Sequence, residues 1–161
     1  VLGSLTDASL ESADFPWRSA QEITIAGVAT LALRINYVGE LGWELHPAMA
    51  DLPSLYAAIW AAGEAHGIAN FGLYALNSLR MEKAYRGWGA ELTNEVTMLE
   101  ADMARFFGSA KEDFVGKAAT ETGEAGPLRL VYFEVDAENA DVRGGEPIFL
   151  NDVCILYLVY I

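Results

Sequence analysis

Residues 37–44 read Tyr37-Val38-Gly39-Glu40-Leu41-Gly42-Trp43-Glu44, and this octapeptide carries the most informative local pattern in the chain. Two glycines within four residues permit tight backbone turns and a close approach of the backbone to another group. Two carboxylates flank an aromatic side chain. One interpretation is a strained loop between two strands. The other is a ligand grip, in which one carboxylate accepts two parallel hydrogen bonds from a planar molecule with adjacent N–H donors. The residues alone leave both interpretations open.

The segment before this octapeptide predicts a β-hairpin. Ile23 and Ile25 alternate with polar neighbours, and Ala26-Gly27 offers a turn. Residues 28–37 then follow the two-residue period of a half-buried strand. One face of that strand would carry Ala29, Leu31, Leu33, Ile35 and Tyr37, and the other would carry Thr30, Arg34 and Asn36. Further upstream, residues 6–13 predict a short helix that stops before Pro16.

The segment after the octapeptide predicts extended structure over residues 43–46 and then helices. Asp51 is the expected cap of the first helix, and Gly67 sits where a left-handed C-terminal cap is needed. A second helix is expected over residues 73–85, with Arg80 on its outward side. Thr97 and Glu100 match a capping box, which predicts a short helix from residue 99 to about 106. The apolar stripe of the first helix comprises Leu52, Leu55, Tyr56, Ile59 and Trp60.

A change in composition near residue 127 predicts a second, β-rich part of the chain. Residues 121–127 are rich in glycine and acidic side chains and indicate a linker. Residues 128–136 then alternate as a strand does, and residues 142–147 turn back into a further strand at 148–150.

The charge balance limits the classes of partner. The chain has 161 residues, a net charge of −13 and only ten Lys and Arg, while 53% of its residues are hydrophobic. The hydrophobic content predicts a globular protein with a sizeable core. The scarcity of cations argues against nucleic acid and anionic membrane surfaces as partners, because both demand clustered cations. A polyanionic small ligand would require a few cations concentrated locally.

Several kinds of catalytic or metal site lack their residues. Cys154 is the only cysteine, so neither an internal disulfide nor a cysteine-rich metal site can form. His46 and His66 fall on different expected elements, which argues against a zinc site. Neither a nucleophile elbow around a serine nor a glycine-rich phosphate loop occurs.

The two ends of the sequence predict neither a signal peptide nor a membrane span. The start at Val1 lacks a basic segment followed by an apolar stretch. The longest apolar run, residues 153–161, is too short to cross a bilayer as a helix. We therefore expect a cytoplasmic protein, or one of the mitochondrial matrix in a eukaryote. Both ends look truncated.

Five motifs in sequence order make the chain similar to the aminomethyltransferase (glycine-cleavage T-protein) folate-binding family. The first is the octapeptide 37–44, and the second is the run 75–85 followed by Trp88-Gly89. The others are residues 91–101, residues 114–117 and residues 144–148. Lys83, Tyr85 and Trp88-Gly89 resemble the branch of the family that forms the C-terminal module of dimethylglycine and sarcosine dehydrogenases.

The resemblance implies roles for two residues of the octapeptide. Tyr37 and Glu44 stand where the family holds the pterin of tetrahydrofolate, whose ring N–H and exocyclic amine suit the Glu44 carboxylate. Glu40 would order the loop. This interpretation requires Glu44 to face a hollow that accepts a pterin, rather than bulk water or a salt bridge.

Departures from the family pattern limit what the chain is expected to do alone. The catalytic aspartate of the family lies upstream of Val1, so the resemblance assigns this chain no catalytic residue and leaves open whether it is an enzyme. Leu76 occupies the place of a T-protein arginine that contacts folate. The FAD-binding half of the fused dehydrogenases is absent, and the sequence after Asn151 no longer follows the family.

Together these observations predict an α+β fold. Residues 1–125 would form part of a T-protein-type folate-binding domain, a mixed sheet with helices, and residues 126–161 the first strands of an incomplete C-terminal β-barrel. The implied function is that of a tetrahydrofolate-dependent one-carbon transfer module from a dimethylglycine or sarcosine dehydrogenase-like protein, inactive as this fragment.

Two other functions remain in view. One is a non-catalytic folate sensor, against which the absence of a Lys-Gly-Cys-x-x-Gly-Gln motif counts. The other is a structural or interaction fragment. The expected partner is a small-molecule folate, and we expect neither nucleic acid, membrane nor metal to bind. We also expect self-association through exposed barrel edges.

Overall fold

The computed structural model describes residues 1–108, 110–123, 126, 128–136, 138–139 and 144–157. Within it the chain divides into two compact units, Val1–Lys83 and Ala84–Ile161. The α+β class expected from the sequence is confirmed, because both helices and antiparallel sheets are present.

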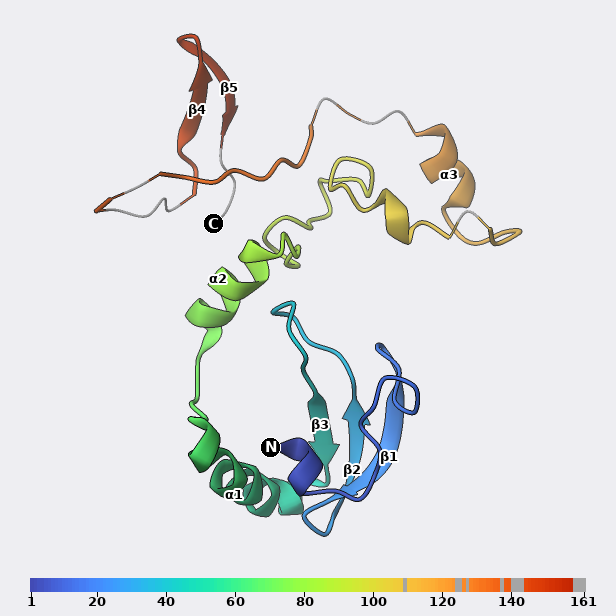
Figure 1. The fold of residues 1–161 in the computed structure, drawn as a ribbon. Helices are drawn as coiled ribbons and strands as arrows, with labels where there is room; N and C mark the ends of the chain where they lie inside the picture. Colours follow the sequence, from blue (N-terminus) through green and yellow to red (C-terminus); the bar gives the residue numbers. More distant parts are fainter. Residues whose placement is uncertain (109, 124–125, 127, 137, 140–143, 158–161) are drawn as a thin grey trace. The chain divides into compact units, whose positions relative to one another are not determined.

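The first unit is built on a three-stranded antiparallel sheet (Figure 1). Its strands are β1 (Ala20–Ile25), β2 (Val28–Leu33) and β3 (Glu44–Pro47), in the order β1-β2-β3. The predicted hairpin is confirmed. Its two-residue turn places Ala26 at φ 48° and Gly27 at φ 80°, and positive φ at both central residues suits the right-handed twist of a hairpin.

The register of the strands decides which face of this sheet is buried. The buried face is not the one that the alternation in β2 favours. Ile23 pairs with Thr30, and directly paired side chains share a face. On that face Ile25, Thr30 and Ala32 are buried, whereas Leu31 on the other side is 42% exposed. Leu31 lies between polar partners, Glu22 on β1 and His46 on β3. We call this exposed side the open face; it carries Ala20, Glu22, Thr24, Ala29, Leu31, Leu33, Glu44 and His46.

Phe15 is the centre of the small core of the first unit. It is fully buried, as is Ile25. The Phe15 ring meets the Trp43 ring edge to face, with their centroids 4.7 Å apart. The Arg34 side chain closes the other side, because its Nη1 donates to the Phe15 carbonyl at 2.6 Å and its guanidinium lies 5.7 Å from the Trp43 ring centre. The N-terminal segment is thereby fastened to the sheet.

The N-terminal segment contains the 3-10 helix η1 (Leu2–Ser4). The prediction of a helix over residues 6–13 is wrong. Local side-chain bonds replace it: the Ala8 amide donates to Thr6 Oγ1 and the Ser9 hydroxyl donates to Asp14. Such bonds compete with helical hydrogen bonding.

The helices of the first unit follow β3. They are η2 (Met49–Asp51), α1 (Leu52–Gly63), η3 (Glu64–His66) and α2 (Leu73–Glu82). Gly67 follows η3 at φ 71°, as the sequence predicted. Asp51 precedes α1 without a side-chain capping bond. The α1 stripe is only partly buried, since Leu55 is enclosed while Leu52 and Tyr56 are each 50% exposed.

Helix α2 departs from expectation in two ways. It stops at Glu82 rather than residue 85, and Ala84 takes a positive φ of 54°. Arg80 is buried, with 4% of its surface exposed, although it was predicted to face outward. Its guanidinium donates through Nε and Nη2 to Asn77 Oδ1, at 2.9 and 2.7 Å. Asn77, about one turn earlier in the helix, thus gives the buried charge a hydrogen-bond acceptor.

The second unit contains short elements. They are η4 (Ala104–Phe106), α3 (Lys117–Thr122) and the antiparallel hairpin of β4 (Pro147–Leu150) and β5 (Val153–Tyr157). The capping box forms, because the Thr97 amide donates to Glu100 Oε2 and the Glu100 amide donates to Thr97 Oγ1. It leads into turns and then η4, not a continuous helix.

Two further expectations for this unit, and one for the sheets of both units, are wrong. Residues 128–136 form no strand in the described structure, because no second strand pairs with them; the Leu130 amide donates instead to the Glu100 carbonyl. Helix α3 takes up the start of the predicted linker, and residues 124–125, 127 and 142–143 lie outside the described residues. The described sheets are antiparallel rather than mixed.

Truncating the central side chain of the first unit tests the core. We expect Phe15→Ala to lower the free energy of unfolding by about 3–5 kcal/mol, because it removes a fully buried ring and leaves a cavity. Ile25→Val, at the other fully buried position, should cost only about 0.5–1.5 kcal/mol. Urea denaturation of the two variants measures both values, and equal losses would contradict this description of the core.

The capping box predicts an acid-sensitive contribution to stability. Hydrogen bonds from the Thr97 amide and hydroxyl lower the pKa of Glu100 below its ordinary value of 4.5. This contribution is therefore complete above pH 4.5 and is lost as the pH falls through the lower pKa of the folded state. Glu100→Gln should flatten the acid limb of thermal stability below the ordinary glutamate pKa of 4.5. An unchanged acid limb would show that this carboxylate is not linked to folding.

Candidate functional site

The octapeptide forms the loop that connects β2 to β3, and Asn36 organises its first turn. Asn36 Oδ1 accepts hydrogen bonds from the backbone amides of Val38, Gly39 and Glu40, at 3.0, 2.6 and 3.2 Å. Its amide nitrogen donates to the Glu40 carbonyl. One side chain thus satisfies four backbone groups, which is the role that asparagine plays in local turns. The sequence placed Asn36 on a strand face and missed this role.

Both glycines of the octapeptide are needed for close contacts within the chain. Gly39 has φ +75°, and a Cβ placed on it would lie 2.8 Å from Cδ and from Cε of Lys83. A Cβ on Gly42 would lie 2.6 Å from the Asn36 Cβ. Real Cβ atoms do not approach so closely. The tight turns predicted from the glycines are present, and the groups that approach the backbone are side chains of this protein.

Glu44 begins β3 on the open face of the sheet. It pairs with Leu33 across the strands, and its side chain is 52% exposed. Oε2 lies 3.5 Å from Nε2 of His46, two residues along the same strand. The carboxylate is therefore accessible, with an aliphatic side chain across from it and an imidazole beside it. The role of Glu44 as a pterin ligand stays a prediction.

The other residues of the octapeptide divide between exposure and packing. Tyr37 is 38% exposed at the start of the loop. Trp43 points the opposite way from Glu44 and packs on Phe15. Glu40 Oε1 lies 3.6 Å from Lys83 Nζ, in keeping with the expectation that Glu40 orders the loop. The loop thus presents Tyr37 and Glu44 at its two ends while its middle is held in place.

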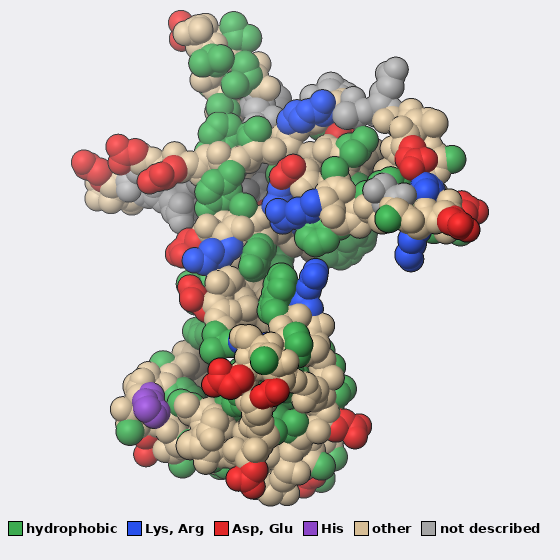
Figure 2. All heavy atoms as spheres, turned by 45° about the vertical axis from the view of Figure 1, so that its right-hand side comes forward, with side chains coloured by type: hydrophobic (Ala, Val, Ile, Leu, Met, Phe, Trp, Pro, Cys, Tyr) green, Lys and Arg blue, Asp and Glu red, His purple; other side chains and the backbone are tan. Residues whose placement is uncertain are grey.

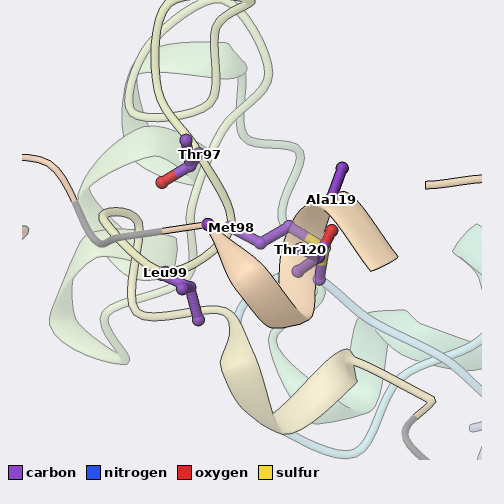
Figure 3. Close-up of a pocket in the computed structure, with 6 residues that line it drawn as sticks. Thr97, Met98, Leu99, Ala119 and Thr120 are labelled. Carbon is purple, nitrogen blue, oxygen red and sulfur yellow. The ribbon is translucent and has the colours of Figure 1, made fainter. Parts of the chain in front are cut away.

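A cavity of about 310 Å³ lies within the second unit (Figure 3). It is lined by the turn at Thr97, Met98 and Leu99 and by Ala119, Thr120 and Gly123 of α3 and its end. The Met98 side chain extends toward Thr120 (Figure 3). Both threonine hydroxyls donate within the chain, Thr97 to Glu100 and Thr120 to the Gly116 carbonyl. The lining is otherwise apolar, so we assign the cavity no ligand.

Charged side chains gather into no metal site within the part of the chain that the structure describes. The acidic side chains are scattered over the visible surface of both units rather than collected in one patch (Figure 2). His46 lies on β3 and His66 on η3, as their separation in the sequence suggested. Across the described ranges, no helix is both long and apolar enough to cross a membrane.

Comparison with known proteins identifies the family of this chain. The model of the GCVT N-terminal domain family matches residues 1–111, and the chain belongs to that family.

The chain is also similar to longer curated proteins. It is 40% identical over 154 residues to human mitochondrial dimethylglycine dehydrogenase, a match that covers 94% of this chain and 18% of the relative. It is 39% identical over 155 residues to mouse mitochondrial sarcosine dehydrogenase (94% and 17%). It is 38% identical over 155 residues to the aminomethyltransferase of Listeria welshimeri (94% and 41%). The chain therefore spans less than a fifth of the dehydrogenases and about two fifths of the aminomethyltransferase. The family recognised from the motifs is confirmed.

Proposed function

We propose that the chain is part of the tetrahydrofolate-binding module of a dimethylglycine or sarcosine dehydrogenase-like protein that transfers one-carbon units. The observation that carries this proposal is the Glu44 carboxylate, half exposed on the open face and presented by a loop that Asn36 holds in shape. The family membership and the two dehydrogenase relatives support it.

The residues present fit a pterin chemically. A pterin offers adjacent N–H donors in one plane, and a carboxylate accepts two such bonds side by side. Each bond to a charged acceptor is worth about 1.5–3 kcal/mol. Leu33, directly across from Glu44, gives an aliphatic surface for a flat ring. Tyr37 would contact the ring with its face or its hydroxyl. Tetrahydrofolate, when bound, supplies the nitrogen that accepts the one-carbon unit.

We further propose that a polypeptide of these 161 residues binds folate weakly and does not catalyse. By the family resemblance, the catalytic aspartate has no counterpart among these 161 residues, and Leu76 takes the place of an arginine that contacts folate. The proposed domains are residues 1–125 and 126–161, with β4 and β5 as the first strands of a barrel. The parent protein would carry FAD on a domain outside this sequence and would work in the cytoplasm, or in the mitochondrial matrix of a eukaryote.

Glu44→Gln tests the proposal directly. The neutral amide loses the charged acceptor, and we expect affinity for a stable reduced folate, 5-formyltetrahydrofolate, to fall by about tenfold or more, since 1.4 kcal/mol is a factor of ten. Isothermal titration calorimetry measures this fall. Glu22→Gln is the matched control, because Glu22 also lies on the open face, on β1 opposite Leu31. The affinity of this control variant for the folate should match that of the unaltered chain.

The structural alternative makes a different prediction for the same variant. It is favoured by the contact of Glu44 with His46, which gives the carboxylate a partner within the chain. If that contact is its only role, Glu44→Gln would lower thermal stability, and the unaltered chain would show no saturable binding of the folate.

Self-association is proposed through the hairpin of the second unit. Phe149, Val153 and Ile155 on β4 and β5 are each more than half exposed. Exposed strand edges with apolar side chains favour pairing with another copy. We expect Ile155→Lys to shift the chain toward the monomer at about 100 μM in sedimentation velocity experiments, whereas an unchanged distribution would exclude this hairpin as the contact.

A further inference from the structure

Lys83 lies across the middle of the octapeptide. It is the residue that follows α2, and the loop between β2 and β3 extends toward that end of the helix (Figure 1). The aliphatic stem of Lys83 passes over Gly39, and its Nζ lies 3.6 Å from Glu40 Oε1. Lys83 therefore contacts two successive residues of the loop by two kinds of interaction, packing and charge.

This contact depends on the absence of a side chain at Gly39. A Cβ at that position would overlap the Cδ and Cε of Lys83 at 2.8 Å and would come nearer still to its Cγ. The positive φ of +75° adds a second reason for glycine, because it strains any residue that carries a Cβ. The backbone at Gly39 is thus shaped to receive the Lys83 stem.

The loop is consequently held from two directions. Asn36 binds three successive amides, those of Val38, Gly39 and Glu40, from within the loop. Lys83 holds the same stretch from the end of α2. The ammonium is directed to Glu40 and not to Glu44, so it leaves the predicted pterin acceptor available.

We propose that Lys83 is a positioning residue for the folate site. It fastens the middle of the octapeptide to the C-terminal end of α2 and thereby fixes where the two ends of the loop present Tyr37 and Glu44. The inference rests on the proposed folate function and adds to it a residue that does not touch the ligand.

A charge exchange provides the test, with the full chain and 5-formyltetrahydrofolate as the probe. An exposed ion pair adds little to folding, so thermal stability should change only slightly where the charge alone is altered. We expect Lys83→Glu to weaken binding by about tenfold, through lost packing and repulsion from Glu40. The double variant Lys83→Glu with Glu40→Lys should recover most of that loss, to within about threefold of the unaltered chain.

Two further variants separate the contributions of charge and stem. Lys83→Met keeps an unbranched stem and should weaken binding by about two- to fivefold, less than Lys83→Ala does. Lys111→Ala removes an exposed lysine of the second unit and controls for the change in net charge. Because Lys83→Met retains the packing on Gly39, it remains informative if Lys83→Ala fails to fold.

The outcomes distinguish this inference from the function on which it rests. Weakened binding by Lys83→Glu together with recovery in the exchanged pair supports the positioning role. Unaltered affinity in every Lys83 variant, while Glu44→Gln weakens binding, overturns the positioning role alone. Weakened binding without recovery in the exchanged pair overturns the pairing with Glu40. Absence of saturable binding by the unaltered chain overturns the folate function, and the positioning role with it.

Discussion

The pairing of β2 with β3 is the constraint on which the site depends. Leu33 stands opposite Glu44, and Leu31 opposite His46. Because side chains alternate between the faces of a strand, a shift of one residue would send Glu44 to the buried face and Trp43 to the open one. The contact of Trp43 with Phe15 opposes that shift, since it requires the ring to remain on the core side. The core of the first unit and the exposure of its carboxylate thus follow from one register.

Local patterns predicted the elements whose causes are local. The Ala26-Gly27 turn, the left-handed Gly67 and the reciprocal bonds of Thr97 and Glu100 were all evident from a few neighbouring residues. Predictions failed where the deciding partner is distant in sequence. The face of β2 that is buried depends on Ile23 and Ile25 in the neighbouring strand.

The same distinction applies to strands and charged residues. A guanidinium on a helix normally faces water, and nothing near Arg80 in the sequence signals its burial. Residues 128–136 alternate like a strand, yet a strand forms only with a partner, and none pairs with them in the described structure. Of the candidate site, Tyr37 and Glu44 were predicted from the family resemblance of the octapeptide, and they stay predictions. The turn signal of an asparagine shortly before a glycine could have identified Asn36, whereas Lys83 is more than forty positions from Gly39 and Glu40 and has no such signal.

The overlap between a Cβ at position 39 and the lysine stem has an evolutionary consequence. A side chain at position 39 would overlap the Lys83 stem in its present conformation, so a substitution of Gly39 requires that stem to leave the loop. Shortening residue 83 would remove this overlap, whereas the positive φ would still disfavour a residue with a Cβ at position 39. We therefore expect homologues that carry a side chain at position 39 to have a shorter residue at position 83 or to lack this contact.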